Sequence, residues 1–141
     1  SLAKLYLRSV CYEVGGRTYI AIGFSNRAGG YELRDDKTFK GTIAPKDIFV
    51  IAGEANNIPH CIFEGFMDFL SYLTMKGQDI APCLVLNSVS NIHRAVAYLR
   101  EHRIAHVRAF LDNDEAGRQA LQVSSIDRNE RRGHEPTLWR I

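Results

Sequence analysis

Acidic residues stand directly after two short apolar segments of the sequence. Glu64 follows the run 61–63, and Asp112 and Asp114 follow the run 107–111. Apolar runs of this length are typical of buried parallel strands, whose carboxyl ends meet at the edge where open sheets bind ligands. We therefore expect these three carboxylates to gather at one edge of a sheet.

Converging carboxylates repel one another, and a hard cation such as Mg²⁺ relieves that repulsion because it prefers oxygen ligands and phosphates. Asp68 falls in the first turn of the helix expected after Glu64 and is placed to complete the cluster. Gly65 lets a backbone or a phosphate approach Glu64 closely. The cluster predicts phosphoryl transfer assisted by Mg²⁺, or by Mn²⁺ in its place.

Structural roles compete with this interpretation for two of the acids. Asp114 is a favoured residue for capping a following helix, and Asp68 in a first turn suits the helix dipole. Glu64 has no such role, because it ends an apolar strand. A calcium-binding EF-hand loop starting at Asp112 is excluded, because Val123 stands at its twelfth position, where a bidentate Glu is needed.

The elements that position these acids are expected in the second half of the chain. Apolar runs at 48–51, 61–63, 84–86 and 107–111 have the length of buried strands. Helical spacing follows the last three of these runs, so the pattern predicts three βα units and a parallel sheet covered by helices.

Each expected helix has an apolar face and an end signal. The first face is followed by Gly77 as a stop, the second is preceded by Ser90 as a cap, and the third begins at Asp114 and is followed by a polar tail. The three apolar faces are Phe66, Phe69, Leu70 and Leu73; Ile92, Ala95, Val96 and Leu99; and Ala116, Ala120, Leu121 and Val123.

The first part of the chain is expected to be antiparallel β structure. Strand-like runs around 5–14, 19–24 and 31–33 are separated by Gly15-Gly16 and by the turn-forming segment 26–30. Basic residues alternate there with aromatic ones, a composition that suits phosphate contacts and base stacking on single-stranded nucleic acid. Cross-strand packing and a solvated basic face are the competing interpretation. The residues concerned are Arg27, Arg34, Lys37 and Lys40, with Tyr19, Phe24, Tyr31 and Phe39; Arg118, in the third helix, is a further candidate for phosphate contact.

Charge is distributed unevenly along the 141 residues. The formal net charge of +2 divides into +3 for residues 1–47 and −1 for residues 48–141. This near balance excludes polybasic and highly charged disordered chains. Three cysteines without a C-x-x-C pair argue against a disulfide framework or a zinc ribbon. We expect a cytoplasmic protein without a membrane segment, and the first residue, Ser1, leads us to expect a fragment of a longer protein.

Two motifs carry a resemblance to a known family. The segments FEGFMD (63–68) and FLDNDEAGR (110–118), with LNS (86–88) between them, resemble the Toprim domain of bacterial primases, topoisomerases and some nucleases. Their E-G-x-x-D and D-x-D-x-A-G-R forms look most like the primase branch. Residues 21–24, 29–34 and 39–41 are similar to the segment before Toprim in primase-like proteins of mobile elements, whose N-terminal zinc finger is absent here.

This resemblance implies an α/β fold: a Toprim-like Rossmannoid parallel sheet flanked by helices, preceded by a small antiparallel β segment. It assigns residues 1–47 to the basic β segment, 48–125 to the Toprim catalytic domain and 126–141 to a polar C-terminal tail without a clear element. A further acidic site expected in primases has no clear equivalent, since Asp127 lacks an apolar strand before it.

The implied site holds Mg²⁺ on Asp112 and Asp114, with Glu64 in metal binding or acid/base steps and Asp68 as an auxiliary acid. The implied function is primer synthesis by nucleotidyl transfer on single-stranded DNA, with nucleotides as substrates and a helicase as a partner reached through regions outside this chain. Two alternatives stay open: a Toprim nuclease that uses the same metal, and a Toprim module that only binds nucleic acid.

Overall fold

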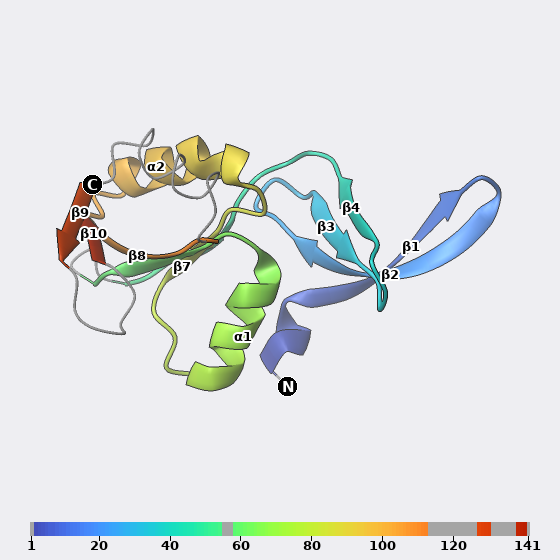
Figure 1. The fold of residues 1–141 in the computed structure, drawn as a ribbon, viewed down its shortest axis with the longest axis horizontal. Helices are drawn as coiled ribbons and strands as arrows, with labels where there is room; N and C mark the ends of the chain where they lie inside the picture. The colour runs from blue at the N-terminus through green and yellow to red at the C-terminus, as the bar shows by residue number, and fades with distance from the viewer. Residues whose placement is uncertain (1, 55–57, 113–126, 131–137, 141) are drawn as a thin grey trace.

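A computed structural model describes residues 2–54, 58–112, 127–130 and 138–140 of the chain. Two β-sheets lie side by side, one antiparallel and one mixed, and a long hairpin extends from the first away from the second (Figure 1). The first sheet has the order β1-β2-β3-β4, with strands Leu7–Val14, Arg17–Ser25, Tyr31–Arg34 and Lys40–Ile43. A short 3₁₀ helix, Leu2–Leu5, precedes it.

The antiparallel sheet confirms the expected β structure and adds β4, which the sequence pattern did not predict. Gly15 and Gly16 have φ angles of 58° and 76°, the left-handed conformation that a tight turn between β1 and β2 requires. The turn between β3 and β4 is shaped by Asp35, whose Oδ1 accepts hydrogen bonds from the backbone of Lys37 at 2.9 Å and of Phe39 at 2.8 Å. A turn held by a side chain has no glycine pair to mark it, and the four residues of β4 show no clear apolar alternation, so the sequence pattern did not reveal this strand.

The second sheet has the order β5-β7-β6-β8-β10-β9. Its first four strands match the four apolar runs, and β6 pairs in parallel with both β7 and β8, as expected. The expected parallel sheet is parallel only in part, because β5 is antiparallel to β7 and β10 is antiparallel to β8. The strands are β5 Phe49–Ile51, β6 His60–Phe63, β7 Cys83–Val85, β8 His106–Phe110, β9 Asp127–Glu130 and β10 Leu138–Arg140.

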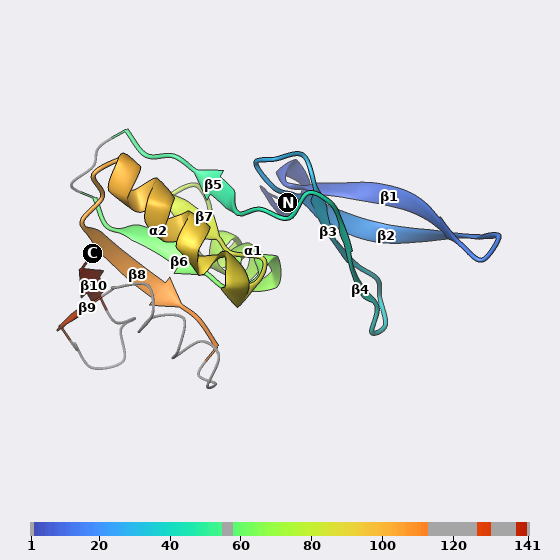
Figure 2. The same cartoon turned by 90° about the horizontal axis from the view of Figure 1, so that it is seen from above.

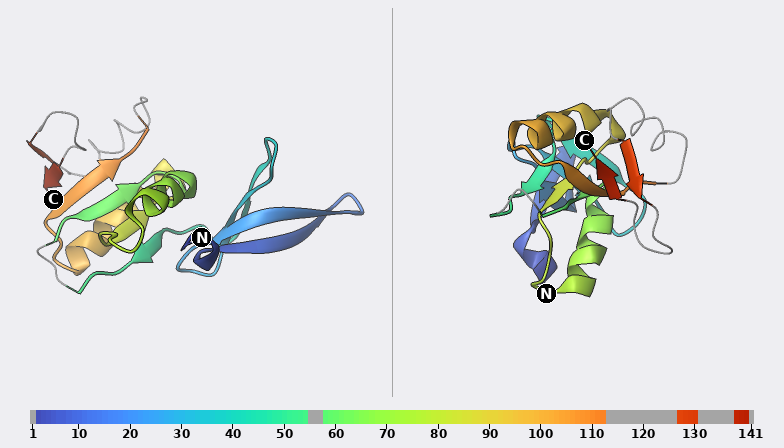
Figure 3. Two further views of the ribbon diagram at one scale, coloured as in Figure 1. Left: turned by 90° about the horizontal axis from the view of Figure 1, so that it is seen from below. Right: turned by 90° about the vertical axis from the view of Figure 1, so that its left-hand side faces the viewer.

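Two helices cover opposite faces of this sheet (Figures 2 and 3). Helix α1, Phe66–Lys76, follows β6, and α2, Ile92–Glu101, follows β7. Each buries the four apolar residues that the spacing predicted, and Gly77 ends α1 in a left-handed conformation with φ 64°. The prediction that Ser90 caps the second helix was wrong. Ser88 caps a 3₁₀ turn, Val89–Asn91, and Asn91 then occupies the cap position of α2.

The C-terminal tail also departs from the prediction. It was expected to lack a clear element, yet β9 and β10 extend the sheet beyond β8, in register with it through the pair Leu138 and Arg108. The edge strand β9 has only polar residues and β10 has only three residues, so neither shows the alternation of apolar residues that marks a strand. The third predicted helix lies outside the described residues.

An aromatic cluster joins the two sheets. Phe24 of β2 is fully buried and stacks on Phe66 of α1, with ring centroids 5.0 Å apart, while Phe49 and Phe69 pack around it. This contact fixes the antiparallel sheet against the end of α1 that lies nearest Glu64. No helix among the described residues is long and apolar enough to cross a membrane.

Candidate metal and phosphate site

Glu64 and Asp112 lie beyond the carboxyl ends of neighbouring parallel strands, β6 and β8. The backbone N–H of Glu64 donates to the carbonyl oxygen of Phe110 at 3.3 Å, which continues the sheet pairing by one residue. The backbone N–H of Asp112 then donates to Oε2 of Glu64 at 2.9 Å. The two acids predicted from separate motifs are therefore linked directly at one sheet edge.

Asp68 lies in the first turn of α1 and faces the same edge. Partial burial raises the pKa of Asp68, and the negative charge of Asp112 raises it further. The negative charge of Asp112 thus disfavours the charged form of Asp68, the effect that one carboxylate has on another nearby. Asp114, the fourth predicted acid, lies outside the described residues.

A cleft of about 400 Å³ opens between these acids and the antiparallel sheet. A Cβ placed on Gly65 would meet no atom of the described residues within 4 Å, so the space beside Glu64 is open to an approaching group. Acidic, basic and amide side chains all reach the cleft. Its lining comprises Arg34, Asp35, Lys40, Glu64, Gly65, Phe66, Met67, Asp68, Asn87, Ser88 and Asp112.

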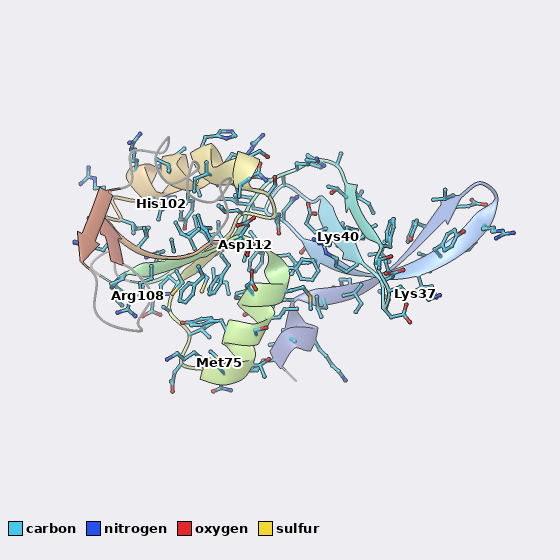
Figure 4. All side chains as sticks on the ribbon, viewed as in Figure 1. Lys37, Lys40, Met75, His102, Arg108 and Asp112 are labelled. Carbon is cyan, nitrogen blue, oxygen red and sulfur yellow. The ribbon has the colours of Figure 1, made fainter. Side chains whose placement is uncertain are left out.

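Two of the predicted basic residues face the acids across this cleft. Arg34 ends β3 and Lys40 begins β4, and the two residues are directly paired in the sheet register. The guanidinium of Arg34 lies 5.3 Å from the ring centroid of Phe66, a cation–π contact that holds it beside the first residue of α1. Figure 4 shows Lys40 and Asp112 on facing sides of the region where the two sheets meet.

Arg27 has a different position. Its Nε lies 3.0 Å from both carboxylate oxygens of Asp47, and its backbone N–H donates to the carbonyl of Ile48 at 3.0 Å. Asp47 is 7% exposed, and its carbonyl accepts a hydrogen bond from Nδ2 of Asn87 at 3.0 Å. This junction of Arg27, Asp47 and Asn87 ties the antiparallel sheet to the end of β7. Arg27 thus positions the sheet that carries Arg34 and Lys40, and it does not line the cleft.

The remaining predicted contacts are not brought to the cleft by the described structure. Lys37 is exposed in the β3–β4 turn, farther out than Lys40 (Figure 4), and Arg118 lies outside the described residues. The prediction that a base stacks on Phe24 was wrong, because that ring is fully buried between the sheets. Tyr19 and Phe39 stack on either side of Tyr12, at 5.5 and 5.2 Å between centroids, away from the cleft lining.

Asn87 and Ser88 line the cleft but were not singled out as site residues from the sequence. Both follow β7, so the rule that selected Glu64 and Asp112 also applies to them. Asn87 has a left-handed backbone with φ 65°, uncommon for a residue other than glycine. Its side-chain Oδ1 is buried without a hydrogen-bond partner among the described residues. This combination marks a constrained residue at the edge of the site.

The donor set fits an open magnesium site better than a closed metal cage. In the described part of the chain, no three His, Cys, Asp or Glu side chains are arranged to enclose a metal ion. Mg²⁺ does not require such a cage, because it keeps several water ligands and is commonly bound by one or two carboxylates together with substrate phosphates. Glu64, Asp68 and Asp112 supply carboxylates on one wall, and Arg34 and Lys40 supply cations on the other.

Comparison with known protein families separates the two sides of this cleft. A family model described as Toprim-like matches residues 61–138, more than half of the chain, and includes every predicted acid. A second model, described as a domain of unknown function (DUF8464), matches residues 1–44 and includes Arg34 and Lys40. No match was found among curated proteins. The acids and the cations of the cleft therefore come from regions that match two different family models.

Proposed function

Because the chain belongs to the Toprim-like family, we propose that it is the catalytic part of a primase-like protein that synthesises RNA primers on single-stranded DNA. Toprim domains bind Mg²⁺ and occur in enzymes such as primases, nucleases and topoisomerases. The family match therefore supports a metal-dependent function related to nucleic acids. Primer synthesis, single-stranded DNA and nucleotides as substrates are the finer part of the proposal.

One observation supports it most: acids and cations face each other across a single cleft. Glu64 and Asp112 are joined at the sheet edge, and Arg34 and Lys40 stand opposite them. A phosphate that enters this space meets positive charge from the antiparallel sheet and a metal-binding edge from the mixed sheet. Among the described residues that line the cleft, the mixed sheet side contributes no cation, and the carboxylate of Asp35 on the antiparallel side accepts backbone hydrogen bonds within the β3–β4 turn.

Each side chain has a role in nucleotidyl transfer under this proposal. The oxygen of a primer 3′-hydroxyl forms a bond to the α-phosphorus of a nucleoside triphosphate, and pyrophosphate leaves. Asp112 and Asp114 would hold Mg²⁺, which would supply charge neutralisation on the phosphate. Glu64 contributes to metal binding or accepts the hydroxyl proton, and Asp68 is an auxiliary acid.

The cations orient the substrate. Nη1 of Arg34 donates a hydrogen bond to the carbonyl oxygen of Leu33 at 2.8 Å, and the other N–H groups of its guanidinium are the candidate donors to phosphate oxygens. Lys40 adds a point charge on a flexible stem. The junction of Arg27, Asp47 and Asn87 keeps both at a fixed place relative to the acids.

Primer synthesis tests the proposal directly. The chain is incubated with a single-stranded DNA template, ribonucleoside triphosphates and Mg²⁺ or Mn²⁺, and labelled products are separated on a gel. We expect Asp112→Asn and Glu64→Gln to lower product formation by about 100-fold or more, as loss of metal-binding or acid/base function does. The matched control is Asp79→Asn, which removes an exposed carboxylate outside the cleft lining.

Other outcomes assign another function. Strand scission without nucleotide incorporation, abolished by the same variants, would replace primer synthesis by nuclease activity. Retained DNA binding without either reaction, together with no Mg²⁺ binding heat in calorimetry, would identify a binding module. Equal primer synthesis by the wild type and Asp112→Asn would contradict the assigned role of Asp112.

A further inference from the structure

A second hollow of about 370 Å³ lies next to the cleft, between α1 and β8. Asp68 and Asp112 line both spaces, so the two are continuous past these carboxylates. We call this second space the α1–β8 groove. Its lining comprises Phe63, Asp68, Ser71, Tyr72, Met75, Phe110, Leu111 and Asp112.

The floor of the α1–β8 groove is aromatic. Phe63 and Phe110 stack with their centroids 4.9 Å apart and their planes at 12°, and the ring of Tyr72 lies 5.1 Å from Phe63. The hydroxyl of Tyr72 is held by the backbone N–H of Ala81 at 3.0 Å. Phe110 and Tyr72 are only partly buried, and Met75 on the rim is 78% exposed. These groups present an apolar surface of the kind on which nucleobases stack.

Two exposed cations flank the far part of the groove. Arg108 precedes Phe110 by two residues on β8, so both project from the same sheet face. Lys76 follows Met75 at the end of α1. The pKa of Cys61, on the strand beneath the groove, is lowered chiefly by a hydrogen bond with Cys83. The positive charges of Arg108 and Lys76 lower it further, which indicates that both cations lie near this strand. Figure 4 shows Arg108 and Met75 on the α1 side of the sheet, away from His102 and α2.

We propose that the α1–β8 groove binds the nucleic-acid strand where it continues beyond the phosphate held in the cleft, stacking a base on Tyr72 and Phe110 and contacting backbone phosphates through Lys76 and Arg108. This inference rests on the proposed function, because it requires nucleic acid in the cleft. The positions of the charges support binding of a nucleic-acid strand. The carboxylates of Asp68 and Asp112 lie where the groove meets the cleft, and the cations Lys76 and Arg108 lie farther from the cleft. An uncharged base suits the middle, next to the aromatic floor.

Oligonucleotides of two lengths test this inference. A labelled single strand of about 12 nucleotides, within the site sizes of single-strand binders, spans cleft and groove, whereas a dinucleotide fills the cleft alone. Anisotropy titrations in Mg²⁺ compare the wild type with the double variant Lys76→Gln/Arg108→Gln. We expect about 10-fold weaker binding of the longer strand and unchanged binding of the dinucleotide. The salt dependence for the longer strand should fall by about 0.7 in log–log slope for each phosphate contact removed.

Matched measurements separate the possible results. Arg100→Gln removes an exposed cation from α2, on the opposite sheet face, and is expected to leave both affinities unchanged. A photoreactive residue at Met75 is expected to crosslink to the longer strand. If the double variant binds the longer strand as tightly as the wild type, with the same salt slope and no crosslink at Met75, the inference is overturned and the groove serves a protein partner. If the wild type binds neither oligonucleotide, the proposed function itself fails and the inference falls with it.

Discussion

Asp47 at the junction and Asp68 at the sheet edge are both aspartates, yet their surroundings shift their pKa values in opposite directions. Partial burial acts to raise the pKa of Asp47, but hydrogen bonds from Arg27 and from the backbone of Ile48, with the charge of Arg27, lower it overall. Burial and the charge of Asp112 both raise the pKa of Asp68. The junction carboxylate is compensated by this chain's own cation, whereas the edge carboxylate stands in a field that a bound cation would relieve.

This difference distinguishes a structural acid from a candidate functional one. Asp47 binds to Arg27, to Ile48 and, through its carbonyl, to Asn87, so it joins the two sheets. Asp68 lines both the cleft and the α1–β8 groove.

Added Mg²⁺ is expected to have the largest effect on stability. A ligand that binds only the folded protein raises the free energy of unfolding by about 2.7 kcal/mol at 100 times its Kd. We expect this gain in the wild type and in Asp47→Asn, and its loss in Asp112→Asn. Urea unfolding with and without Mg²⁺ measures it. An equal gain in all three proteins would show that the metal binds elsewhere.

Removal of the junction charge is expected to have the next largest effect. Asp47→Asn weakens a charge-assisted pair with Arg27 and should lower the free energy of unfolding by about 1–2 kcal/mol, because Arg27 is partly exposed and solvent screens the pair. The same substitution at the edge, Asp68→Asn, is the matched control and should cause no loss in metal-free buffer. Urea unfolding in EDTA compares the two, and equal destabilisation would contradict the distinction.

The smallest effect is in the pH dependence of stability. The lowered pKa of Asp47 gives a contribution that is present above its unfolded-state value near 4 and is lost as pH falls through its folded-state value. The raised pKa of Asp68 gives the opposite sign: its favourable contribution is present below the unfolded-state value and is lost as pH rises through the folded-state value. Asp68→Asn should therefore gain stability over the wild type as pH rises from about 4 to 7, whereas the deficit of Asp47→Asn should shrink below pH 4. Thermal melts in metal-free buffers check both slopes, and parallel curves would contradict the assignment.

Much of the fold was predictable because its signals are local. The apolar faces of α1 and α2 are the predicted ones, and four predicted strands lie in the mixed sheet. β4 was missed because it follows a turn shaped by a side chain, β9 because its four residues are all polar, and β10 because three residues are too few to show a strand period. The antiparallel direction of β5 arises from its pairing with β7. Nothing in residues 49–51 themselves distinguishes an antiparallel strand from a parallel one.

The acids of the candidate site could be predicted from the sequence, but which of the basic residues accompany them could not. Glu64 and Asp112 could be paired in advance because both follow apolar strands, and parallel strands end at the same edge. Arg27 and Arg34 looked alike in sequence, since both are basic residues in a β-rich segment. The structure separates them: Arg27 binds Asp47, twenty residues away, and Arg34 lies over Phe66 at the cleft.

The acidic motifs, their place after strands and the helical faces behind them follow from residue type and periodicity, because these signals act over a few neighbouring positions. The cations that face those acids, the burial of Phe24 in the core and the groove with an aromatic floor beside the cleft emerge from the packed structure alone. These properties depend on how two sheets pack against each other, and packing brings together residues whose distance in sequence carries no signal of contact.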